Sequence, residues 1–201
     1  MVVDVHAHHC PTEYLRRMGR PDILRPTAGR PHQGVSERSA LVDLLGVGSQ
    51  VLSVSQAQPH IPTARDGADA AQLANDRYVE MCARHLARIF TFAPLPSPHV
   101  DESLDEIARV ADDPAVVGMT LGPSIAGIQL DGPVLEPVLE ELDRRHRVVF
   151  VHPVGQESTP WLSGHTLAWS IGEVGIEDPD GIRGATGSKL LGLAACLAGP
   201  S

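Results

Sequence analysis

Three histidines have the residue type and the placement that metal chemistry requires. His6 and His8 lie in the opening segment VVDVHAHHCP (residues 2–11), and His152 lies in VVFVHP (148–153). Alternate residues of a β-strand point to the same face, so His6 and His8 would project together, with Asp4 one step earlier on that face. Zinc and related ions bind neutral imidazole nitrogens and take three or more protein ligands. The pair therefore offers half of a metal site, or else two polar residues where a strand enters a loop.

Short apolar runs predict the strands that must carry these side chains. Each run is rich in Val or Ile and bounded by turn residues, and the five are Val2–His6, Gln50–Ser55, Ile89–Ala93, Val116–Leu121 and Val148–His152. Their continuous apolar character is typical of parallel strands buried on both faces. His152 ends the fifth strand as the histidine pair ends the first, so all three histidines are expected at the edge where βα barrels have their active sites. A metal ion would satisfy a ring nitrogen that burial otherwise makes costly.

Helical periodicity fills the segments between the strands. The predicted helices are Pro133–Arg145, a segment after Pro98, Ala70–Leu86 and a shorter one at Glu37–Leu45 that ends at Gly46 or Gly48. Residues 19–36, APLPSP (93–98) and PSIAGIQLDGP (123–133) are predicted loops. Strands and helices thus alternate, which predicts an α/β fold with a parallel sheet.

Composition limits the classes of partner. The chain has 201 residues, of which 42% are hydrophobic, and 16 basic against 25 acidic residues give a net charge of −9. This balance disfavours nucleic acid and anionic membranes as partners, and the longest apolar stretch (190–199) is too short for a membrane span. Cys10, Cys82 and Cys196 are odd in number and far apart, and no leader sequence precedes Val2, so a reducing, cytoplasmic location is expected.

Several blocks resemble one enzyme family, and they come in the family's order. DVHAHH followed by PTEYL, then residues 74–96, 116–145 and 148–155, are similar to the amidohydrolase superfamily. The resemblance is to its amidohydrolase-2 branch, which includes aminocarboxymuconate-semialdehyde decarboxylase and related aromatic-acid decarboxylases. It covers residues 1–172 of a single domain (1–201), and residues 173–201 diverge.

The resemblance implies a distorted (β/α)8 barrel that holds one divalent metal ion, zinc ahead of manganese. His6, His8 and His152 would be its ligands. The ion would lower the pKa of bound water and polarise an oxygen of a small-molecule carboxylate substrate. A carboxy-lyase that decarboxylates an aromatic or enoic acid is the first expectation, and a hydrolase is the second. The family also uses a histidine in an HxGG-like context and a late aspartate, and neither His165 nor Asp178 or Asp180 matches them.

Chain length predicts a partial barrel. A (β/α)8 barrel takes about 250 residues and each βα unit about 30, whereas 49 residues follow His152. We expect a TIM-barrel-like fold of about five parallel strands with surrounding helices, and poor solubility or pairing into a homo-oligomer to cover the open edge. The alternative function is a truncated, catalytically incomplete relative, altered after Gly172, with little or no activity.

Other residues have competing interpretations. His9 would point away from the histidine pair and pack or bond within the loop, and Cys10 would be a small buried residue. Arg16 or Arg17 could bind a substrate carboxylate or lie in solvent. His60 could approach the barrel mouth, and Trp161 and Trp169 could line a pocket or the core. The GxSxG sequence of serine hydrolases is absent from the chain.

Overall fold

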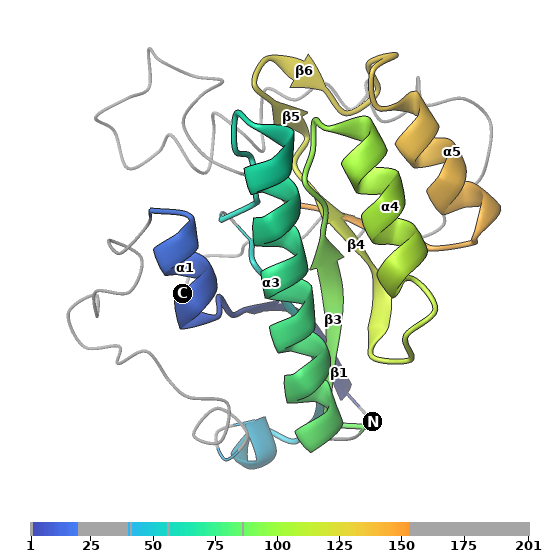
Figure 1. The fold of residues 1–201 in the computed structure, drawn as a ribbon. Helices are drawn as coiled ribbons and strands as arrows, with labels where there is room; N and C mark the ends of the chain where they lie inside the picture. The colour runs from blue at the N-terminus through green and yellow to red at the C-terminus, as the bar shows by residue number, and fades with distance from the viewer. Residues whose placement is uncertain (1, 20–39, 41, 56, 86, 153–201) are drawn as a thin grey trace, which may run out of the picture.

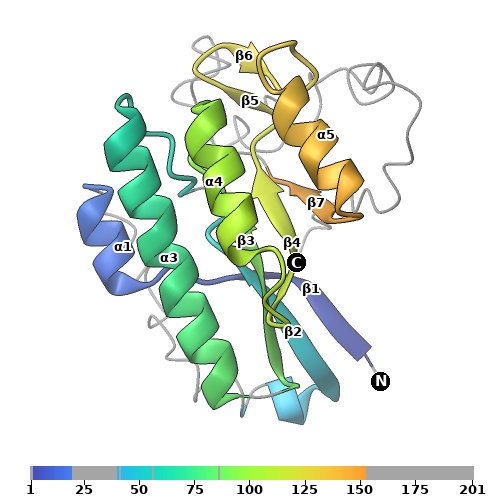
Figure 2. The same cartoon turned by 45° about the vertical axis from the view of Figure 1, so that its right-hand side comes forward.

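The computed structural model describes residues 2–19, 40, 42–55, 57–85 and 87–152. Its main feature is a five-stranded, fully parallel sheet in the order β1-β2-β3-β4-β7, with four helices along one side (Figures 1 and 2). The strands are β1 (Val2–His8), β2 (Val47–Ser53), β3 (Ile89–Pro94), β4 (Val116–Leu121) and β7 (Val148–Val151). The helices are α1 (Thr12–Arg17), α3 (Ala64–Arg84), α4 (Val100–Val110) and α5 (Glu136–Arg144). The predicted α/β fold with five parallel strands is confirmed.

The sheet is curled rather than flat. Neighbouring strands lie about 4.8 Å apart, so four intervals would separate β1 from β7 by about 19 Å in a flat sheet. Nevertheless, the Nε2 atom of His152, directly after β7, lies 3.0 Å from that of His6 on β1. The right-handed twist of the strands produces this curvature, and the five strands form a half-barrel of the TIM-barrel type.

The two faces of the sheet pack differently. Leu52 and Ile89 face α3, where they meet Tyr78, and Met119 faces α4, where it meets Ile107. The other face, which we call the interior face, carries Val51, Phe92 and Phe150 together with the three histidines. The rings of Phe92 and Phe150 stack at 4.8 Å. The interior face thus has an apolar layer that gives way to histidine at the carboxyl ends of the strands.

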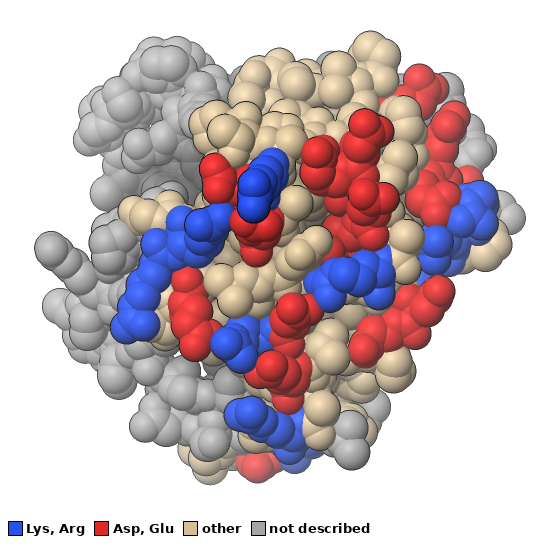
Figure 3. Space-filling model, in the orientation of Figure 1, with Lys and Arg blue, Asp and Glu red and all other residues tan. Residues whose placement is uncertain are grey.

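A buried glutamate joins helices α3 and α4. Glu106 of α4 is 2% exposed and accepts hydrogen bonds from Asn75 Nδ2 of α3 (2.6 Å) and from Arg109 (2.7 and 2.8 Å). Arg109 also pairs with Asp76 at 2.7 Å. On the helix-bearing surface acidic and basic side chains interleave (Figure 3). These pairs hold α3 and α4 in place behind the strands that carry the interior face.

Several boundaries differ from the sequence expectations. β1 continues to His8, because His8 pairs with Ser53 of β2. α3 begins at Ala64, six residues earlier than expected, because the Thr63 hydroxyl accepts a hydrogen bond from the Asp66 amide and caps the helix. Residues 40 and 42–44 are helical within the expected Glu37–Leu45 segment, which ends at Gly46 with φ +69°.

The expected loop 123–133 contains a small hairpin. β5 (Ser124–Ile125) and β6 (Ile128–Gln129) pair antiparallel. The two residues between them, Ala126 and Gly127, have φ of +50° and +79°, which is the geometry of a type I′ turn. The prediction of a loop was wrong for Ser124–Ile125 and Ile128–Gln129, because a two-residue turn between isoleucines favours a hairpin.

The expectation that each strand is buried on both faces was wrong for β1. Val2, Val3 and Val5 are 60%, 41% and 39% exposed, because β1 is an outer strand of the sheet. In the part of the chain that the structure describes, none of the helices combines the length and apolar character needed to cross a bilayer.

Candidate metal centre

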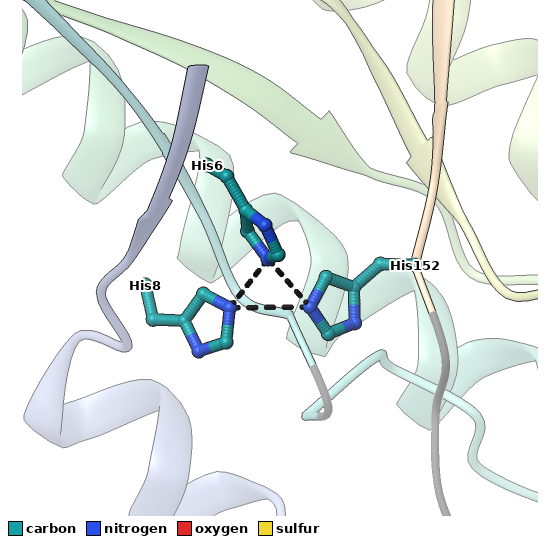
Figure 4. A group of neighbouring side chains, drawn as sticks. All are labelled: His6, His8 and His152. Atoms are coloured by element: carbon teal, nitrogen blue, oxygen red, sulfur yellow. Dashed lines mark hydrogen bonds between the residues drawn. The ribbon is translucent and has the colours of Figure 1, made fainter. Parts of the chain in front are cut away.

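Three imidazole rings converge on one point between the two outer strands. The Nε2 atoms are 2.8 Å apart for His6 and His8, 3.0 Å for His6 and His152, and 3.1 Å for His8 and His152 (Figure 4). His152 is 5% exposed, His6 is half-buried and His8 is exposed. Residues that are 144 positions apart in sequence therefore present the same ring atom to one another.

Local structure explains why these rings meet. His6 and His8 share a face of β1 because they are two residues apart on a strand. The Asp4 carboxylate accepts hydrogen bonds from the His6 backbone amide (3.0 Å) and from Gln50 Nε2 of β2 (2.8 Å), and so ties β1 to its neighbour. His152 donates its backbone N–H to Leu121 O of β4 at 2.9 Å. Both outer strands are thus fixed at the level of the rings.

The three nitrogens cannot all satisfy one another by hydrogen bonding. Each Nε2 carries either a hydrogen or a lone pair, so at least two of the three are alike, and that pair repels. A shared cation removes the conflict. Two nitrogens bound to a divalent ion at about 2.0–2.1 Å are about 2.9 Å apart when they subtend 90° at the ion and about 3.3 Å apart at the tetrahedral angle, and the observed 2.8–3.1 Å is nearer the first value. The donor set fits one divalent metal ion.

The protonation of His6 also suits a ligand. Burial lowers the pKa of the His6 imidazole below its usual 6.5, although the nearby Asp4 acts in the opposite direction. A lower pKa favours the neutral ring, and metal ions bind neutral imidazole. The environment therefore favours the form of His6 that can bind a metal ion near neutral pH.

Other residues considered from the sequence have structural roles. Arg17 bonds Asp66 and Asp69 of α3, at 2.9 and 3.0 Å, and so joins α1 to α3. His9 lies beyond β1, where its backbone carbonyl accepts a hydrogen bond from Tyr78 Oη and its amide donates to Ser53 O at 3.0 Å. Arg16 is exposed. Trp161, Trp169, His165, Cys196, Asp178 and Asp180 lie outside the described residues.

The two described cysteines are not joined by a disulfide and lie in packed surroundings. Cys10 is half-buried and donates to Val54 O at 3.3 Å. Burial raises the pKa of the Cys82 thiol to about 11, so it remains protonated at neutral pH. Neither belongs to the histidine cluster, which contains His6, His8 and His152.

His60 lies in the β2–α3 segment with its Nε2 atom buried and unpartnered among the described residues. Burial lowers its pKa from 6.5 to about 4. The unfolded chain would bind a proton below about pH 6.5 while the folded chain does not until about pH 4, so stability should fall as pH drops through this window. We expect a loss of about 1–2 kcal/mol at pH 5 relative to pH 7.

The variant His60→Gln should lose less stability than the wild type between pH 7 and pH 5, as measured by urea unfolding. His146→Asn is the matched control, because His146 is exposed and asparagine tolerates its φ of +53°. This control should retain the wild-type pH dependence. Equal pH dependence in the wild type and His60→Gln would contradict the assignment.

Sequence reasoning missed a group of buried polar residues near the cluster. Ser53 and Ser55 lie at the end of β2, with their hydroxyls 3.1 Å apart, and Gln58 follows them. Gln58 Nε2 donates to Thr120 Oγ1 of β4 at 2.9 Å. The available signal was the segment SVSQAQ (53–58), which carries four polar residues directly after an apolar run.

Comparison with known proteins gives a consistent family. The decarboxylase of 2-amino-3-carboxymuconate-6-semialdehyde from Dictyostelium discoideum is 28% identical over 140 residues, which are 67% of this chain and 38% of that protein. Gamma-resorcylate decarboxylase from Rhizobium sp. (strain MTP-10005) is 29% identical over 148 residues, 66% of this chain and 45% of that protein. This chain therefore spans less than half the length of either relative.

A solved structure has the same fold. It is a dihydroxybenzoic acid decarboxylase from Polaromonas sp. JS666 with bound manganese and the inhibitor 2-nitroresorcinol. The TM-score is 0.70 at 19% identity, over 83% of this chain and 54% of that one.

The family model described as Amidohydrolase matches residues 3–176, most of the chain. The chain belongs to the amidohydrolase-2 family.

Proposed function

We propose that this chain is a metal-dependent carboxy-lyase that decarboxylates a small aromatic or enoic acid. His6, His8 and His152 would hold one divalent ion. The observation that carries the proposal is the meeting of three Nε2 atoms within 3.1 Å of one another at the carboxyl ends of β1 and β7. The names of the two curated relatives support decarboxylation over hydrolysis.

The donor set favours zinc as that ion. Three imidazoles suit zinc, whereas manganese prefers oxygen ligands. The bound manganese of the dihydroxybenzoic acid decarboxylase structure supports manganese as the second choice. When bound, the ion would act as a Lewis acid towards a substrate oxygen and lower the pKa of water.

The residues around the cluster would prepare it for such a substrate. Phe150 lies edge-on to the His6 ring, with centroids 5.4 Å apart, and stacks on Phe92. This apolar layer, in which Phe92 and Phe150 are 6% and 3% exposed, would shield one side of the cluster from water. Asp4 holds the His6 backbone in place. The carboxylate of the substrate would face the cationic side, and its ring would face the phenylalanines.

We also propose a cytoplasmic location and a homo-oligomeric assembly for this chain. The buried Cys82, which forms no disulfide, supports a reducing, cytoplasmic location. The exposed valines of β1 support self-association of the chain into a homo-oligomer.

Metal loading and carbon dioxide release test the proposed reaction. The purified chain is first stripped of metal and then given zinc or manganese. It should retain about one ion per chain, as measured by inductively coupled plasma mass spectrometry. It should release carbon dioxide from 2,6-dihydroxybenzoate. Hydrolysis of an aryl ester without carbon dioxide release would favour the hydrolase. Metal binding without any turnover would favour the catalytically incomplete alternative, and absence of metal binding would contradict the site.

A further inference from the structure

One buried side chain near the cluster has an unused hydrogen-bond acceptor. Gln58 is 3% exposed and donates through Nε2 to Ser55 O (3.1 Å) and to Thr120 Oγ1 (2.9 Å). Because a carbonyl oxygen only accepts, the bond to Ser55 fixes which end of the amide is nitrogen. The other end, Oε1, is buried and has no hydrogen-bond partner among the described residues.

The partners of Gln58 place it on the interior side of the sheet, towards the end that carries the histidines. Ser55 follows Ser53, the β2 residue that pairs with His8 in the sheet. Thr120 pairs with Phe150 of β7. The ring of Phe150 lies 5.4 Å from that of His6 and 5.8 Å from that of His152. The amide therefore spans the interior side from β2 to β4, at the end of the sheet that carries the cluster.

Buried acceptors in native proteins nearly always have a donor, and an acceptor without one calls for a partner such as water, an ion or a ligand. We propose that Gln58 Oε1 accepts a hydrogen bond from a hydroxyl or amino group on the ring of the substrate, and that Gln58 is therefore a specificity-determining residue. This inference rests on the proposed function. An ionised carboxylate has no hydrogen to donate, so Oε1 would select the donor substituent and leave the carboxylate to the histidine side.

Ligand binding tests the inference without depending on turnover. Affinities of the full chain for 2-hydroxybenzoate, 2-methoxybenzoate and benzoate are measured by calorimetry, with and without zinc. The wild type should bind the hydroxylated acid at least about tenfold more tightly than the other two, because a site built to pair a hydroxyl discriminates against analogues that lack it. Gln58→Met, of similar length without the acceptor, should remove this preference.

Two further variants keep the test decisive. Gln129→Met changes an exposed glutamine of β6 and should retain the preference. Thr120→Val removes the hydroxyl that positions the amide and should weaken the preference, so it decides the matter if Gln58→Met does not fold. A wild type that binds the three acids equally or not at all, an unchanged preference in the deciding variant, or an Oε1 that bonds ordered water only would overturn the inference. Binding with the expected preference but no carbon dioxide release would overturn the proposed reaction alone.

Discussion

Replacing His6 and His8 together by alanine is expected to abolish metal binding by this chain. The double variant leaves one imidazole, His152, of the three whose Nε2 atoms lie 2.8–3.1 Å apart. Loss of a residue that merely orients a ligand typically costs 10–100-fold in metal affinity, so loss of two ligands should cost more than about 100-fold. Metal content after dialysis against zinc, together with competition against a chelator of known affinity, measures the effect.

The same variant separates a metal site from a structural cluster. Without metal, alanine at both positions removes nitrogens that repel one another, so the unfolding free energy should stay within about 1 kcal/mol of the metal-free wild type. The control variant His146→Asn should bind metal as the wild type does, because His146 is exposed and precedes β7, whereas His152 follows it. Full zinc occupancy in the double variant would show that other residues bind the ion.

Gly118→Ala should be the most damaging single substitution in the sheet. A Cβ atom at Gly118 would lie 2.4 Å from the backbone oxygen of Val148, closer than atoms of real proteins approach. Gly118 pairs directly with Val148 across β4 and β7, so relief requires the two backbones to separate. We expect a loss of about 2–4 kcal/mol and weaker zinc binding, because β7 carries His152 into the cluster.

The variant Gly127→Ala is the control for Gly118→Ala. A Cβ atom there meets open space, and only the φ of +79° opposes it, which costs about 1–2 kcal/mol. Zinc affinity should not change, since this turn lies outside the sheet that carries the histidines. Urea unfolding and zinc titration of both variants measure the contrast. Wild-type stability in Gly118→Ala would show that β4 and β7 are not held as closely as the structure indicates.

The parts of this site that depend on local pattern were predictable from sequence. His6 and His8 fall on one face because strands have a period of two, and His152 follows a valine-rich run that could only be a strand end. The curl that brings β1 to β7 left no trace in local periodicity, since it arises from twist summed over five strands. Gln58 was missed although its segment is rich in polar residues, because its unused oxygen becomes apparent only once its partners Ser55 and Thr120 are known.

The exposed valines of β1 show that an apolar run does not predict whether a strand is buried. A run such as VVDV predicts a strand, but not whether it lies inside the sheet or at its side. Val2 and Val3 are 60% and 41% exposed because β1 has one described neighbour, β2. Burial is decided by the topology of the whole sheet.

The cluster joins the first strand of the sheet to the last. An ion held there would tie together residues that are 144 positions apart in the sequence. Because it would bind the folded chain and not the unfolded one, it would stabilise the fold by about 4 kcal/mol at a free ion concentration a thousandfold above Kd. Because His152 follows β7 in the sequence, all three histidines are present only after the five described strands have been synthesised, so metal uptake would mark the assembled half-barrel.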